Sequence, residues 1–131
     1  MGGVTGRYGL VLAALLFAGC SGSELERANL ETLTAEEIFR LAEGELSRGN
    51  AGRAADTFEE IERLYPYSQW SKRAIMMSAF SYHRAGEYDN SRSAAQRYLD
   101  FYPADDDAAY AQFLISLSYY CLLYTSDAAD D

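Results

Sequence analysis

The feature that most constrains this chain is an internal repeat with a period of 37 residues. A shift by that distance aligns Gly49 with Gly86 and the pair Tyr65-Pro66 with Tyr102-Pro103. A period of about 20 to 50 residues is typical of solenoids, because a single helical hairpin buries its apolar face only when neighbouring hairpins stack on it. The repeat therefore predicts a stack of helical hairpins.

Small and apolar residues recur at matching positions of both repeats, with the spacing of a tetratricopeptide repeat. These positions are Ala42, Ala54, Phe58, Ile61 and Pro66 in the first repeat, and Ala79, Ser91, Ala95, Tyr98 and Pro103 in the second. We predict an all-α, tetratricopeptide-like helical-hairpin solenoid. It contains two complete repeats, residues 34–66 and 67–103, and the first helix of a third, residues 104–120.

Local signals set the ends of the expected helices. Thr34 and Glu37 have the spacing of a capping box, so the first helix should begin after Thr34 and end near Arg48. Further helices are expected at 51–65, 68–85, 87–102 and 108–120. Glycines mark the turns inside the hairpins, and Pro66 and Pro103 end the second helices, because proline is not tolerated inside a helix.

The N-terminal residues have the pattern of a bacterial lipoprotein leader. An apolar run follows Arg7, but at about ten residues it is roughly half as long as a bilayer-spanning helix. Small residues directly precede Cys20. We predict a signal peptide at 1–19, and then an acylated Cys20 that begins a flexible tether at 20–33. The alternative is an ordinary cleaved signal peptide in which Cys20 has no role.

The C-terminal residues depart from the repeat. Residues 121–131 contain neither the glycine turn nor the second helix that a third repeat requires. They look like the translated adapter sequence that ends many environmental-sequencing reading frames. We interpret 121–131 as a non-native tail on a chain cut within its third repeat. The alternative is a genuine short tail.

Charge and motif spacing argue against nucleic-acid binding and catalysis. The formal net charge is −9, whereas nucleic-acid binders concentrate basic residues on one face. His83 is the only histidine, and its spacing to Asp89 and the serines does not support a triad. The acids 105–107 are interpreted as charges at a helix N-terminus, not as calcium or catalytic carboxylates. We expect no enzyme activity, no metal and no cofactor beyond lipid on Cys20.

The first helix of each hairpin in such repeats lines one face of the stack, and that face is apolar here. We predict that it binds extended peptides with aromatic side chains. Each residue alone is more typical of core packing than of ligand contact, so the prediction depends on the residues as a set. The predicted binding residues, counted from Ala42, Ala79 and Ser116, are Phe39, Leu46, Met76, Phe80, His83, Arg84, Tyr110, Phe113, Leu117 and Tyr120.

The stretches Leu64–Ser68 and Ala79–Asp89, with Trp70 between them, resemble the BamD family over residues 33–120. That family is the lipoprotein of the β-barrel assembly machinery, a scaffold of about five tetratricopeptide repeats. The resemblance implies an N-terminal fragment that is lipid-anchored at the periplasmic face of the outer membrane. It also implies unfolded outer-membrane proteins as clients. The expected partners are outer-membrane lipid and other subunits of the machinery, notably BamA, but no nucleic acid.

This chain lacks the later repeats that contact partners in that family. The leading hypothesis is a peptide-binding scaffold that takes part in the assembly and insertion of β-barrel proteins into the outer membrane. The alternative is an interaction module of a cell-envelope enzyme whose catalytic domain has been lost by truncation.

Overall fold

A computed structural model describes residues 29–127 of the chain. The chain divides into two units, Met1–Thr32 and Leu33–Asp131, and the following description concerns the second unit. Cys20 and the predicted signal peptide lie outside the described residues. The helices of the second unit are α2 (Ala35–Ser47), α3 (Ala51–Leu64), α4 (Gln69–Arg84), α5 (Tyr88–Phe101) and α6 (Ala108–Asp127).

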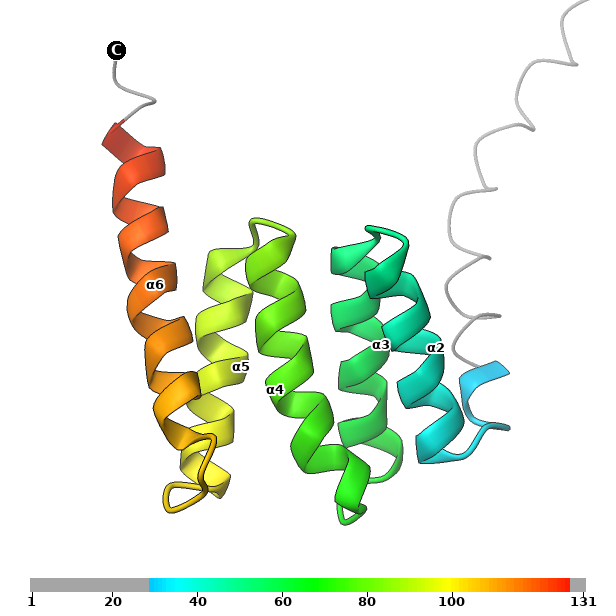
Figure 1. Ribbon diagram of the computed structural model, residues 1–131. Helices are drawn as coiled ribbons and strands as arrows, with labels where there is room; N and C mark the ends of the chain where they lie inside the picture. Colours follow the sequence, from blue (N-terminus) through cyan, green and yellow to red (C-terminus); the bar gives the residue numbers. More distant parts are fainter. Residues whose placement is uncertain (1–28, 128–131) are drawn as a thin grey trace, which may run out of the picture. The chain divides into compact units, whose positions relative to one another are not determined.

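Consecutive helices lie side by side in chain order and reverse direction at each turn (Figure 1). Each helix packs on the next, and α4 also contacts α2 and α6. The first helices α2, α4 and α6 therefore form one layer, and the second helices α3 and α5 form the other. This arrangement confirms the predicted all-α stack of hairpins. The last helix continues past the expected end at Tyr120 to Asp127.

Two glycines close the hairpins because their backbones adopt a left-handed conformation. The φ angle is +88° at Gly49 and +79° at Gly86, a region that other residues enter only at a cost. The residue after each glycine donates its backbone N–H back into the helix, from Asn50 to the Glu45 carbonyl at 3.0 Å and from Glu87 to the Tyr82 carbonyl at 2.9 Å. Both turns are thus Schellman-type helix ends, as the glycine signals predicted.

The predicted capping box at the start of α2 is confirmed. The Thr34 hydroxyl accepts the Glu37 backbone N–H at 3.3 Å, and the Glu37 carboxylate accepts the Thr34 backbone N–H at 2.8 Å. The Thr34 hydroxyl also donates to the Glu37 carboxylate at 2.8 Å. The two hydrogen bonds that the carboxylate accepts, first from the Thr34 backbone and then from its hydroxyl, lower the pKa of Glu37 because they favour the charged form. Ser68 caps α4 in a simpler way, since its hydroxyl accepts the Ser71 N–H at 3.1 Å.

Most of the repeat positions predicted from spacing form the core between the two layers. Eight of them are buried, namely Ala42, Ala54, Phe58, Ile61, Ala79, Ser91, Ala95 and Tyr98, whereas Pro66 and Pro103 are exposed in the connections that follow α3 and α5. The serine that replaces alanine in the second repeat remains satisfied there, because the Ser91 hydroxyl donates to the Ala79 carbonyl at 2.8 Å. In the first repeat the Phe39 ring lies 5.0 Å from both Phe58 and Trp70. Burial of each such ring stabilises the fold by roughly 1.5–3 kcal/mol.

Polar side chains join the first hairpin to the second. The Arg97 guanidinium donates to Glu59 and to Glu62, each at 2.9 Å, and so ties α5 to α3. The Tyr82 hydroxyl lies 3.0 Å from carboxylate oxygens of Asp56 and of Glu59. Burial and these two carboxylates raise the pKa of Tyr82. The hydroxyl therefore stays protonated and available as a donor between helices α3 and α4.

Asp105, just before α6, collects donors from α4 and α5. Its carboxylate forms an ion pair with Lys72 and accepts the Tyr98 hydroxyl at 2.5 Å and the Asp107 backbone N–H at 3.1 Å. Together these donors, Lys72 first, lower the pKa of Asp105 to about 2. The sequence pattern alone indicates only that the acids 105–107 are charges at the N-terminus of the following helix, and it does not predict these contacts between helices. Within residues 29–127 no cluster of three metal-ligating side chains is placed to hold a metal ion.

Substitution of Gly86 by alanine should destabilise the fold by about 1–2 kcal/mol, because the backbone there is left-handed. An added Cβ would meet no atom within 4 Å, so backbone strain is the whole effect. The matched control is Gly44→Ala inside α2, where a Cβ would lie 3.6 Å from an Arg48 nitrogen, an ordinary contact. That variant should gain about 0.5–1 kcal/mol. Urea unfolding followed by circular dichroism measures both, and equal shifts would contradict the assigned turn.

Acid should selectively weaken the contact made by Asp105. The folded pKa of about 2 lies below the ordinary value of 3.8, so the carboxylate stabilises the fold above about pH 4. That stabilisation should be lost as the pH falls through about 2. Unfolding free energies measured across this range should fall for the wild type and converge on those of Asp105→Asn. Exposed Asp106 offers the control, since Asp106→Asn should keep the wild-type pH dependence.

Candidate functional site

The open side of the first-helix layer carries the candidate site, and we call it the first-helix face. On α4 the side chains that point outward follow spacings of three, four and eleven residues, which lie on one side of a helix. This α4 stripe consists of Arg73, Met76, Met77, Phe80 and Arg84, all half-buried or exposed. The intervening residues are buried against the other helices: Ala74, Ile75, Ser78, Ala79, Ser81 and Tyr82.

The equivalent stripe on α6 is aromatic. Phe113 is 55% exposed and Tyr120 60% exposed, and the Tyr110 and Phe113 rings stack at 6.1 Å. Leu117 lies half-buried between them. On α2 the exposed or half-buried equivalents are polar instead, namely Glu36, Arg40, Glu43 and Ser47, whereas the equivalent of Met76 is Phe39, which is buried. Across the first-helix face the surface therefore changes from charged on α2 to aromatic on α6.

Both arginines of the α4 stripe lie over aromatic rings. The Arg73 guanidinium carbon is 5.0 Å from the Phe39 ring centre and 5.3 Å from that of Trp70. The Arg84 guanidinium carbon is 5.9 Å from the ring centre of Phe80. Such cation–π contacts stabilise the positions of the guanidinium groups and leave N–H donors at their edges open to a ligand.

The structure gathers most of the residues predicted for binding on this face. Met76, Phe80 and Arg84 lie on α4, and Tyr110, Phe113, Leu117 and Tyr120 lie on α6.

Three predicted binding residues lie in other surroundings. Phe39 is only 2% exposed and lies in the core beneath Arg73. Leu46 is half-buried near the end of α2. The His83 ring is 5.3 Å from that of Tyr88, and its Nε2 is 4.0 Å from the sulfur of Cys121.

The predicted binding residues are counted from one small residue in each repeat. That count does not include Arg73, Met77 and Trp70. The available signal was helical geometry, because Arg73 precedes Arg84 by eleven residues and therefore lies on the same side of the helix. Met77 lies between them on that side. Trp70, one turn before Arg73, supports the guanidinium at the junction with Phe39.

Arg73 also borders a hollow of about 800 Å³ at the start of α4. Its lining comes from the loop before α4, the first turn of that helix and the end of α5. The lining residues are Tyr67, Ser68, Gln69, Trp70, Lys72, Arg73, Tyr102 and Asp107. The hollow therefore continues the aromatic and basic character of the α4 stripe toward the connection between the hairpins.

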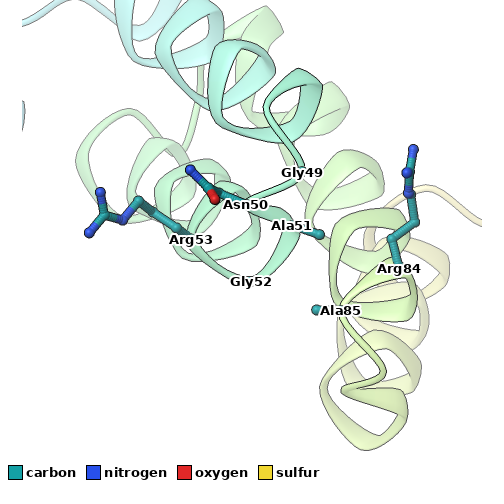
Figure 2. Close-up of a pocket in the computed structure, with 7 residues that line it drawn as sticks. All are labelled: Gly49, Asn50, Ala51, Gly52, Arg53, Arg84 and Ala85. Carbon is teal, nitrogen blue, oxygen red and sulfur yellow. The ribbon is translucent and has the colours of Figure 1, made fainter.

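A second hollow, of about 530 Å³, lies at the turn between α2 and α3 (Figure 2). Gly49, Asn50, Ala51, Gly52 and Ala85 line it together with two arginines. Figure 2 shows that the side chains of Arg53 and Arg84 point in different directions. They do not converge on one ligand position, so this hollow is not built as an anion site.

The stacked hairpins define an all-α protein with a tetratricopeptide-like fold. Among residues 29–127 none of the helices is both long enough and apolar enough to cross a membrane. The chain belongs to the YfiO family, described as outer membrane lipoproteins, whose model matches residues 31–127. Together with the relatives described next, this membership confirms the resemblance to BamD proteins drawn from the sequence.

Relatives named outer membrane protein assembly factor BamD match most of this chain. The protein from Caulobacter vibrioides is 35% identical over 115 residues, which are 84% of this chain and 36% of that protein. The protein from Rickettsia prowazekii is 28% identical over 117 residues, 87% of this chain and 45% of the relative. The chain thus spans less than half the length of these curated relatives.

Proposed function

We propose that this chain takes part in outer membrane protein assembly as a lipid-anchored, non-enzymatic scaffold that binds unfolded client peptides. The names of the relatives support the assembly role. The open first-helix face supports the binding role. The partners that the family resemblance implies are outer-membrane lipid and other subunits of the β-barrel assembly machinery, notably BamA.

The observation that carries this proposal is the concentration of large apolar side chains on the first-helix face. Phe113 and Tyr120 expose more than half of their surface, and Phe80 is half-buried between the two arginines of α4. Exposed apolar patches on a soluble surface mark interaction sites more often than isolated residues do. An extended peptide with aromatic side chains offers the complementary apolar area, and no bond needs to be made or broken.

The proposed location is the periplasmic face of the outer membrane. This proposal rests on the sequence of the lipoprotein leader, on Cys20 and on the family description. The leader and Cys20 lie outside the residues that the structure describes. The alternative, an interaction module of a cell-envelope enzyme, is less well supported because the relatives that match this region are named as assembly factors.

Phe80→Ala should weaken the binding of an aromatic-rich peptide by about ten- to a hundredfold. Burial of an aromatic ring contributes roughly 1.5–3 kcal/mol to such a contact. The measurement is fluorescence anisotropy of a labelled peptide titrated with the full chain in lipid nanodiscs, with empty nanodiscs as the blank. The control is Phe101→Ala, because Phe101 is 61% exposed but lies on α5, away from the first-helix face. Equal affinity of folded wild type and Phe80→Ala would move the binding surface elsewhere.

Cys20 should carry fatty acid in a bacterium with two membranes, and the protein should fractionate with the outer membrane. Metabolic labelling with a fatty acid analogue measures the modification, and Cys20→Ala should abolish it. Cys121→Ser is the matched control, since a label on Cys121 would not depend on the leader. Label retained in Cys20→Ala, or unlabelled soluble wild-type protein, would argue against a lipoprotein.

A further inference from the structure

Among residues 29–127 most basic side chains form ion pairs with carboxylates, namely Arg40–Glu36, Arg48–Glu45, Arg63–Glu60, Lys72–Asp105, Arg92–Asp89 and Arg97–Glu59. Arg73 and Arg84 form none within that range, and neither does Arg53, which lies on α3 outside the first-helix face. Within residues 29–127 no carboxylate oxygen lies at ion-pair distance from Arg73 or Arg84. Both guanidinium groups rest on aromatic rings instead, so their donors remain available for an acidic ligand.

The two arginines mark the ends of one apolar strip. They are eleven residues apart, which places them within about 20° of each other around α4 and about 16 Å apart along its axis. Met76, Met77 and Phe80 lie between them on the outward side. The order along the helix is therefore cation, apolar surface and cation.

The neighbouring helices restrict where an acidic ligand would lie. On α2 the outward side carries Glu36 and Glu43, which repel carboxylates, although Glu36 is paired with Arg40. The outward side of α6 carries aromatic residues and no charged side chain between Ala108 and Ser126. A bound acidic peptide would thus lie over α4 and toward α6.

We propose that the α4 stripe selects extended peptides with two acidic side chains four residues apart and an apolar side chain midway between them. This inference rests on the proposed peptide-binding function and specifies its ligand. Alternate side chains of an extended strand share one face, and residues four apart are separated by about 13 Å. The remaining difference of about 3 Å is within reach of flexible glutamate and arginine side chains. The acids then meet Arg73 and Arg84, and the middle side chain covers Met76, Met77 and Phe80.

The net charge of the chain makes this pattern selective. At −9 the molecule repels acidic peptides in general, and salt screens that repulsion over about 10 Å. An acidic side chain gains affinity only where a guanidinium is directly in reach. Two acids at the wrong spacing therefore add repulsion without both contacts.

Three labelled peptides of equal length test the proposal on the full chain in nanodiscs. One has the pattern Glu-X-Phe-X-Glu, one has the same composition with adjacent glutamates, and one has glutamines in place of both glutamates. Each exposed ion pair should contribute about threefold. At low salt the spaced peptide should therefore bind about tenfold more tightly than the glutamine peptide and about threefold more tightly than its isomer, which can meet only one arginine. The advantage over the glutamine peptide should shrink to about threefold in Arg73→Ala and in Arg84→Ala, and disappear in the double variant.

The controls separate charge from structure. Arg53→Ala removes an exposed arginine that also lacks an ion pair within residues 29–127 but lies on α3, outside the first-helix face, and it should leave the tenfold ratio unchanged. Arg73→Lys and Arg84→Lys keep the positive charge and should retain part of the affinity ratio. Circular dichroism checks the helicity of every variant. Equal affinity of wild type for both isomers, or a ratio that survives the double variant, would overturn the proposal. If the glutamine peptide also fails to bind, the proposed peptide-binding function fails with it.

Discussion

The close approach of the two helices in each hairpin is the constraint on which the rest of the structure depends. It is possible only because small side chains occupy the crossing positions, Ala42 and Ala54 in the first hairpin and Ala79 and Ser91 in the second. Larger side chains there would separate the layers and expose the core. These buried positions maintain the stack, and most outward residues of the first helices contribute less to it, although Met76 and Phe80 still pack partly against the core. The chain thereby largely separates the residues that hold the fold from those on the first-helix face.

What was predictable from the sequence follows from this separation. Helix ends and core positions repeat every 37 residues and depend on local spacing, so they were found without a structure. The contacts of Asp105 were not, because Lys72 lies 33 residues away and nothing periodic links the two. Phe39 occupies a position where the later repeats expose their side chains, but it is covered by packing against Trp70. Such differences depend on which neighbour lies opposite, and a repeat pattern does not contain that information.

Ion pairs between side chains also stabilise the stack of helices. Several carboxylates pair with a cation three or four residues away, whereas Arg97 joins Glu59 and Glu62 across the hairpin boundary. Surface ion pairs are individually weak, but those between hairpins connect elements that are distant in sequence. Within residues 29–127 the two arginines of the α4 stripe, like Arg53, are exceptions to this pairing. The charges of Arg73 and Arg84 are stabilised by aromatic rings, which hold the guanidinium groups in place without neutralising them.

The position of Trp70 has an optical consequence. It is the only tryptophan of the chain, and its indole lies at the junction of α2 and α4 with the Arg73 guanidinium 5.3 Å away. A cation at that distance perturbs the excited state of an indole, so its emission depends on where Arg73 is. Light at the red edge of the tryptophan absorption band does not excite the tyrosines, so the emission comes from Trp70 alone. The unmodified chain therefore carries an intrinsic spectroscopic reporter at one end of the α4 stripe.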